Sequence, residues 1–169
     1  MLRGEHVELT EIRPEDKEAL FRWINDAETV RFNAAYRPVD WESHCRWFDE
    51  LGRSPSRVIF AIRLREQPAI VGTVQLVDVH PVHRSAELII RIGSATDRGK
   101  GFGTEAVKLA TNFAFDDLNL VRVWLRVFAT NARAIGAYKK AGLAEEGTMR
   151  KAVFSQGQWL DEIIMAVVR

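Results

Sequence analysis

The stretch that most constrains this chain occupies residues 98–104 and reads Arg-Gly-Lys-Gly-Phe-Gly-Thr. It follows an apolar run at 88–92, which predicts a strand, and precedes a run at 105–115 that predicts a helix. Glycines leave backbone N–H groups uncovered, and the start of a helix adds unpaired N–H groups and the positive end of the helix dipole. We therefore predict a main-chain cradle for a polyphosphate, to which Arg98 and Lys100 add positive charge.

Two familiar phosphate-binding loops do not fit these residues. The nucleotide P-loop places Ser or Thr directly after Gly-Lys, whereas Lys100 is followed by Gly101. The dinucleotide motif needs a third glycine, where this chain has Thr104, and an acid at the end of the next strand. Residues 121–129, which predict that strand, contain neither Asp nor Glu. A nucleotide-binding enzyme is therefore disfavoured.

Length, charge and cysteine content narrow the class of protein. The chain has 169 residues, the usual length of one domain, so we predict a single domain over 1–169. The net charge of +1, with no long run of like charge, gives no case for binding nucleic acid. The single cysteine excludes an internal disulfide and fits a reducing cytoplasm, which is the expected location. We expect neither a signal peptide nor a membrane partner, because the longest apolar run, 163–168, is too short to span a bilayer.

Hydrophobic periodicity predicts the order β-α-α-β-β-β-α-β-α-β-β. The expected strands are 7–10, 57–64, 70–79, 86–92, 121–129, 143–153 and 159–168, and the expected helices are 14–24, 41–51, 105–115 and 131–141. The buried stripe of the second helix is expected to be Trp41, Cys45, Phe48 and Leu51, and residues 76–77 are expected to form a bulge. The order predicts an α+β fold with a mixed, mostly antiparallel sheet and helices on both faces.

The turn at 98–104, placed after the fourth strand, resembles the pyrophosphate loop of the GNAT superfamily of N-acetyltransferases, which bind acetyl-coenzyme A. A second signature of that family is matched by Asn131, Ala134 and Tyr138, followed by Lys-Ala-Gly-Leu at 140–143. The segments 23–26 (Trp-Ile-Asn-Asp) and 159–162 (Trp-Leu-Asp-Glu) are similar to the branch that contains the ribosomal-protein alanine/serine N-acetyltransferases. The resemblance covers nearly the whole chain and implies acetyl-CoA as co-substrate, with no metal.

The resemblance also implies which residues hold the coenzyme. Main-chain groups beside the fourth strand would contact the pantetheine arm, the glycine-rich turn would bind the diphosphate, and Asn131 would reach the coenzyme arm. The implied cofactor-binding residues are Ile90, Arg91, Ile92, Arg98, Gly99, Lys100, Gly101, Phe102, Gly103, Thr104 and Asn131. Asn131 is equally well placed to cap the helix that follows it, and Ile90 and Ile92 are equally suited to the sheet core.

Two residues are candidates for acid–base chemistry. Tyr138 matches the family tyrosine that protonates the leaving thiolate, and a phenol is a donor at neutral pH. Glu87 lies before the turn at a spacing that resembles the glutamate base of histone-acetylating members, and it would take a proton from the amine directly or through water. The structural alternatives are a core tyrosine with a satisfied hydroxyl, and a glutamate that pairs with a basic side chain.

The acceptor is expected to be a primary amine, on a small molecule or on a protein N-terminus. Residues 25–39 are expected to choose it, with Asp26 and Glu28 available to a cation and Phe32 and Tyr36 to apolar groups. The alternative function is a non-catalytic acyl-CoA-binding or regulatory module on the same fold. Many family members are dimers, so the resemblance also allows a homodimer.

Other reactive residues have simpler explanations. His44 and Cys45 are neighbours in a predicted helix, where adjacent side chains point apart, so we expect a buried thiol rather than a nucleophile pair. Asp78, His80 and His83 are expected in a solvated turn and not around a metal ion.

Overall fold

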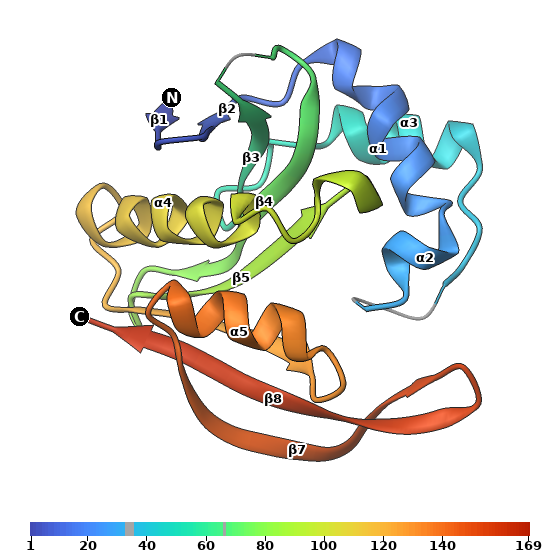
Figure 1. Cartoon of the computed structure of the whole chain (residues 1–169). Coiled ribbons are helices and arrows are strands. Elements are labelled where there is room, and N and C mark those ends of the chain that lie inside the picture. Colours follow the sequence, from blue (N-terminus) through green and yellow to red (C-terminus); the bar gives the residue numbers. More distant parts are fainter. Residues whose placement is uncertain (33–35, 66) are drawn as a thin grey trace.

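The computed structural model describes residues 1–32, 36–65 and 67–169. Its eight strands form one sheet in the order β1-β2-β3-β4-β5-β6-β8-β7 (Figure 1). The strands are β1 Leu2–Arg3, β2 Val7–Thr10, β3 Val58–Leu64, β4 Ile70–His80, β5 Ser85–Ile92, β6 Arg122–Phe128, β7 Ala144–Ser155 and β8 Gln158–Val168. The helices are α1 Lys17–Ile24, α2 Ala27–Val30, α3 Trp41–Asp49, α4 Phe102–Asp116 and α5 Ala132–Lys140. Two 3-10 turns, Pro14–Asp16 and Ala95–Asp97, precede α1 and α4.

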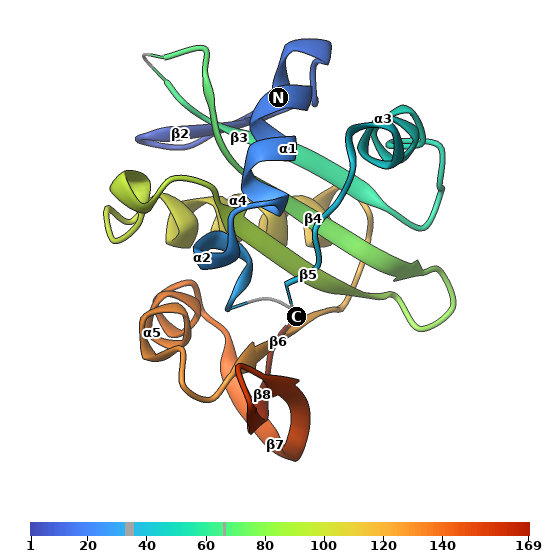
Figure 2. The ribbon, with the colours of Figure 1, turned by 90° about the vertical axis from the view of Figure 1, so that its right-hand side faces the viewer.

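The predicted fold class is confirmed. β5 and β6 pair in parallel, and the other neighbouring strands of the described sheet are antiparallel. Figure 2 shows α1 and α3 in front of the sheet and α4 behind it. No helix in the described part of the chain is both long and apolar enough to cross a membrane.

Helix α4 supplies the largest helical part of the core. Its buried residues recur with the period of a helix, and they pack against β2, β4, β5 and β6. They are Ala106, Val107, Ala110, Thr111 and Ala114. Because most of them are alanine, the helix axis lies close to the sheet, and the N-terminus of α4 is held beside the end of β5.

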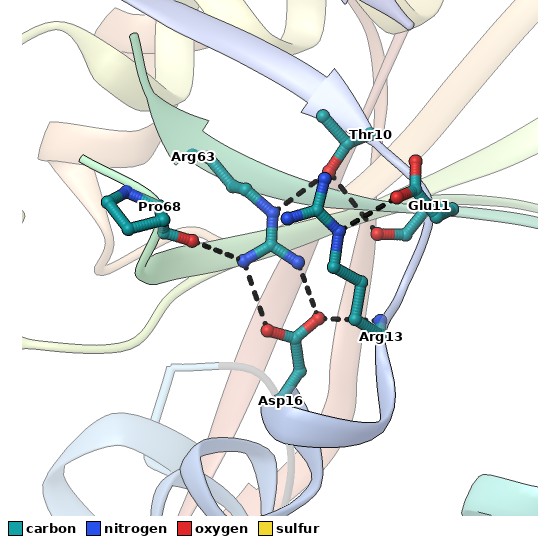
Figure 3. A network of polar contacts seen from close by, with 6 residues as sticks. All are labelled: Thr10, Glu11, Arg13, Asp16, Arg63 and Pro68. Atoms are coloured by element: carbon teal, nitrogen blue, oxygen red, sulfur yellow. Dashed lines mark hydrogen bonds and ion pairs between the residues drawn. The ribbon is translucent and has the colours of Figure 1, made fainter. Parts of the chain in front are cut away.

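A buried ion pair fixes the entry to α1 (Figure 3). Asp16 Oδ2 and Oδ1 accept hydrogen bonds from the Arg63 guanidinium at 2.7 and 3.1 Å, and the two side chains are only 3% and 2% exposed. Arg63 also donates to Thr10 Oγ1 at 3.0 Å and to the Pro68 carbonyl at 2.7 Å. The backbone N–H of Arg13 donates to Asp16 Oδ2 at 2.8 Å. The network therefore joins β2, β3, the turn after β3 and the start of α1.

Two elements were not predicted. β1 adds a short edge strand beside β2, and α2 lies inside the segment 25–39 that was expected to be a loop. Asp26 caps α2, because its side chain accepts hydrogen bonds from the Glu28 N–H at 3.1 Å and the Thr29 hydroxyl at 2.5 Å. Residues 33–35 of that segment lie outside the described residues.

The predicted buried stripe of α3 is wrong. The side chain that faces the interior is His44, which is 3% exposed and whose Nε2 lies 2.8 Å from the Lys17 carbonyl oxygen. Trp41 is 46% exposed, and Cys45 is only partly buried. The rings of Phe21 and Trp47 lie against His44, so an aromatic cluster centred on His44 takes the place of the expected stripe. The irregularity expected at 76–77 falls slightly later, between Val77 and His80.

Candidate active site

The site is built where two parallel strands separate. β5 and β6 are paired only from Ser85 opposite Arg122 to Glu87 opposite Trp124. β5 continues to Ile92 and β6 continues to Phe128, so their far ends diverge and leave backbone groups of β5 without a partner strand among the described residues on that side (Figure 2). A cavity of about 460 Å³ lies there, lined by β5, the turn after it, the start of α4, and α5.

The glycine-rich turn has the geometry that the sequence predicted. Gly99 and Gly101 have φ values of +79° and +88°, a region that a side chain strongly disfavours. Gly101 is the N-cap of α4, and hydrogen bonding inside the helix begins with the Glu105 N–H, which donates to the Gly101 carbonyl at 3.1 Å. The N–H groups of residues 102–104 therefore have no carbonyl within the helix, and they can bind an anion together with the helix dipole.

The two charged side chains of the turn make contacts within the protein. The Arg98 guanidinium donates to the Thr29 hydroxyl and to the Gly93 carbonyl, both at 2.9 Å, so it ties α2 to the end of β5. Lys100 Nζ lies 3.7 Å from Asp97 Oδ1. The main-chain N–H groups of residues 102–104 can therefore bind an anion without the help of Arg98, whose guanidinium is already hydrogen-bonded within the protein.

Helix α5 brings Asn131 and Tyr138 to the opposite wall of the cavity. Asn131 Oδ1 accepts a hydrogen bond from the Ala134 N–H at 3.2 Å, so this residue caps α5 as the structural alternative predicted. Its amide nitrogen is then the group that can donate to a ligand. Tyr138 packs partly against the core, and burial raises the pKa of its hydroxyl to about 12. The hydroxyl is therefore a hydrogen-bond donor throughout the neutral range.

Glu87 lies at the point where the strands separate. Its side chain is 10% exposed, and Oε1 accepts a hydrogen bond from Arg126 Nε at 2.9 Å. The pairing with a basic side chain, the structural alternative for this residue, is therefore present. Glu87 is outside the cavity lining, and its role as a base stays a prediction.

The cavity brings together most of the predicted site. Its lining includes Ile90, Arg91, Ile92, Arg98, Gly99, Gly101, Gly103, Thr104, Asn131 and Tyr138. Lys100 and Phe102 are neighbours of that lining in sequence but do not belong to it. From the segment expected to select the acceptor, Phe32 lines the cavity, whereas Tyr36 is 45% exposed.

Several lining residues of this site received no role from the sequence. They include Thr29, Arg133, Gly136 and Lys140. The last three are spaced three and four residues apart in one predicted helix, so they share a face with each other, and this spacing could have identified them. Thr29 carried no such signal, because its position depends on contacts with Arg98 and Asp26.

The described residues contain no group of three or more His, Cys, Asp or Glu side chains arranged to hold a metal ion. His80 and His83 stack on each other with ring centroids 4.1 Å apart, and the His83 N–H donates to His80 Nδ1 at 3.0 Å. These contacts build the turn between β4 and β5.

The sheet is mixed, and its parallel strands β5 and β6 separate. A helix N-terminus lies at the opening between them, and a tyrosine lies opposite it. Together these features define a class of acyl-CoA-binding folds. The family model described as an acetyltransferase (GNAT) domain matches residues 6–144. The chain therefore belongs to the GNAT acetyltransferase family. The matches do not single out the ribosomal-protein branch, which stays a prediction.

Sequence relatives include spermidine N(1)-acetyltransferases. The chain is 41% identical to the Escherichia coli (strain K12) protein over 96 residues, which is 57% of this chain and 51% of that protein. Identity to the Vibrio cholerae protein is 34% over 95 residues, or 56% of this chain and 54% of that protein. The match thus spans about half the length of these relatives.

Solved structures show that the fold is shared along the whole chain. Spermidine N-acetyltransferase from Vibrio cholerae in complex with CoA and spermine has a TM-score of 0.89 and 22% identity, covering 98% of this chain and 96% of that one. A structure of the Vibrio cholerae enzyme described as dodecameric has a TM-score of 0.82, also at 22% identity, covering 98% of this chain and 95% of that one.

Proposed function

We propose that this protein is an acetyl-CoA-dependent N-acetyltransferase that transfers an acetyl group directly to a primary amine. The observation that carries the proposal is the cavity between the diverging ends of β5 and β6, which is lined by the N-terminus of α4 and by the protonated Tyr138. Membership of the GNAT acetyltransferase family supports the same activity.

The chain's own groups suffice to hold the coenzyme. The main-chain N–H groups of the turn and the first residues of α4 would bind the diphosphate. The free edge of β5, residues 90–92, would form hydrogen bonds with the pantetheine arm in the manner of an added strand. Asn131 would donate from its side-chain amide. When bound, acetyl-CoA supplies an acetyl group activated as a thioester.

Transfer needs a neutral amine and a stabilised leaving thiolate. The ammonium first loses one proton to become the neutral amine. The amine nitrogen then forms a bond to the acetyl carbon, the bond between that carbon and sulfur breaks, and the nitrogen loses a second proton, which balances the proton taken up by the leaving thiolate. A free alkyl ammonium has a pKa of about 10, so a proton acceptor is required at neutral pH. We assign that step to Glu87, acting through an ordered water because Glu87 lies outside the cavity lining. Backbone N–H groups of β5 would polarise the thioester carbonyl, and Tyr138 would donate its proton to the thiolate.

The acceptor proposed first is a small molecule, because the relatives at 41% and 34% identity are named for spermidine. A protein N-terminus is the second candidate, carried over from the resemblance to the ribosomal-protein branch. Self-association is also proposed, since a structural neighbour is described as dodecameric. The cytoplasmic location expected from the single cysteine stays a prediction.

The experiment combines calorimetry with a turnover assay. Isothermal titration should show that CoA binds, and free thiol should appear when acetyl-CoA is mixed with a panel of primary amines. Tyr138→Phe should lower turnover by about 100-fold while leaving the affinity for CoA unchanged, because it removes only the proton donor. Equal turnover by this variant would remove Tyr138 from the mechanism. CoA binding without thiol release for any amine would instead favour the non-catalytic acyl-CoA-binding module.

A further inference from the structure

Arg91 lies beside the place where the thioester would be held, but on the other face of β5 from the phosphate cradle. Side chains alternate along a strand, so Arg91 points away from the face shared by Ile90 and Ile92. Those two isoleucines face α4, because a Cβ built on Gly103 would lie 3.7 Å from Ile92 Cγ1 and 3.9 Å from Ile90 Cδ1. The Arg91 side chain is therefore directed to the acceptor side of the sheet.

On that side Arg91 lines the cavity together with Thr29 and Phe32. Its Nε atom is buried and has no hydrogen-bond partner among the described residues. Burial lowers the pKa of the guanidinium below its ordinary value, and no carboxylate in the described part of the chain opposes this change. Desolvating a cation that has no counter-ion costs free energy, and an anion bound to the Arg91 guanidinium would offset that cost.

The other charges around the cavity do not supply such an anion. Among the described lining residues, Asp97 is the single acid, against four basic residues. Asp97 already lies 3.7 Å from Lys100. The two carboxylates that the sequence offered to a cationic acceptor are also engaged: Asp26 caps α2, and Glu28 Oε1 lies 3.8 Å from the Arg98 guanidinium.

We infer that Arg91 binds a carboxylate on the acceptor, so that the substrate class is a small amino acid-like amine rather than a polyamine. The guanidinium can donate two parallel hydrogen bonds to a carboxylate, which orients the acceptor as well as binding it. The amine of the same molecule then faces the thioester at the free edge of β5. This inference rests on the proposed acetyltransferase function and narrows its acceptor.

The test compares acceptors that differ only at the carboxylate. L-lysine is matched with cadaverine, L-alanine with L-alaninamide, and spermidine represents the polyamines. The wild-type protein should show a higher kcat/KM for the carboxylate member of at least one pair. Arg91→Leu should reduce the preference within that pair by about 10- to 100-fold, the range expected for a charge-assisted hydrogen bond. Arg91→Lys should restore part of it.

A matched control shows whether the acceptor preference depends on the position of Arg91 or only on the number of positive charges in the cavity. Arg133→Leu removes a cation from the same cavity on the α5 side, so it should affect CoA binding without changing the preference within a pair. Titration with CoA and a melting curve verify that each variant is folded. A merely structural role for Arg91 would lower kcat/KM equally for both members of a pair.

The outcomes separate this inference from the function on which it rests. If spermidine is a better acceptor than both amino acids, or if neither pair favours its carboxylate member, the inference is overturned and the acetyltransferase function stays in place. A preference that survives Arg91→Leu would also overturn it. No transfer to any of the five amines, with CoA still bound, would overturn both.

Discussion

Removal of the Asp16 carboxylate should strongly destabilise the fold, although Asp16 is remote from the cavity lining. In Asp16→Ala, Arg63 keeps its hydrogen bonds to Thr10 and Pro68 but loses the two to the carboxylate, and its charge stays buried. Breaking a buried pair in this way costs about 3–5 kcal/mol of unfolding free energy. For a chain of this length that predicts a melting temperature lower by about 6–20 °C.

The assay is a double-mutant cycle followed by urea or thermal unfolding. Asp16→Leu combined with Arg63→Met replaces both charges with apolar groups. The double variant should therefore lose clearly less unfolding free energy than the sum of the losses measured for Asp16→Leu and Arg63→Met alone. The exposed pair of Glu42 and Arg46, with side chains 83% and 62% exposed, provides the control. Glu42→Ala should cost less than about 0.5 kcal/mol. A loss for Asp16→Ala that is as small as this control would refute the argument from burial.

Three further predictions concern the site. Gly101→Val should cost about 1–2 kcal/mol of stability, because Gly101 has a φ of +88°, and should weaken CoA binding measured by calorimetry; unchanged affinity would count against the cradle. Arg98→Met should raise KM for the amine more than Kd for CoA, because it frees Thr29 on α2; steady-state kinetics will show whether the effects differ. Between pH 10 and about 12 the unfolded chain loses the Tyr138 proton while the folded chain keeps it. The free energy of unfolding should therefore fall as pH rises, and melting curves of Tyr138→Phe should show a smaller fall.

Local sequence predicted the strands and helices that surround the site, apart from α2. The turn at 98–104 was recognisable because the requirement for positive φ is met by glycine itself and needs no distant partner. The alternation along β6 and the helical spacing in α4 were also readable, since both are periods of the backbone. Tyr138 and Asn131 were found by their spacing in a family signature, and the structure brings both to the cavity.

Side-chain partners were harder to predict than elements. Arg63 stands in an otherwise apolar strand and gave no sign that it would be buried against Asp16, which is 47 residues away. His44 looked like the polar neighbour of a buried cysteine, and its burial depends on a carbonyl in α1. Glu87 could be read as a base or as an ion-pair partner, and only the position of Arg126 on the neighbouring strand shows that the pair exists.

The sequence by itself determined the order of the elements other than β1 and α2, the glycine-rich turn and the family resemblance, because each depends on residues close together in the chain. Only the tertiary structure decided that β5 and β6 separate after Glu87 and Trp124. It also decided that Arg98 is tied to α2 and that Arg91 Nε is buried without a hydrogen-bond partner among the described residues. The physical reason is that strand divergence, burial and the pairing of charges depend on which distant segments are packed together, and periodicity along the chain does not record that.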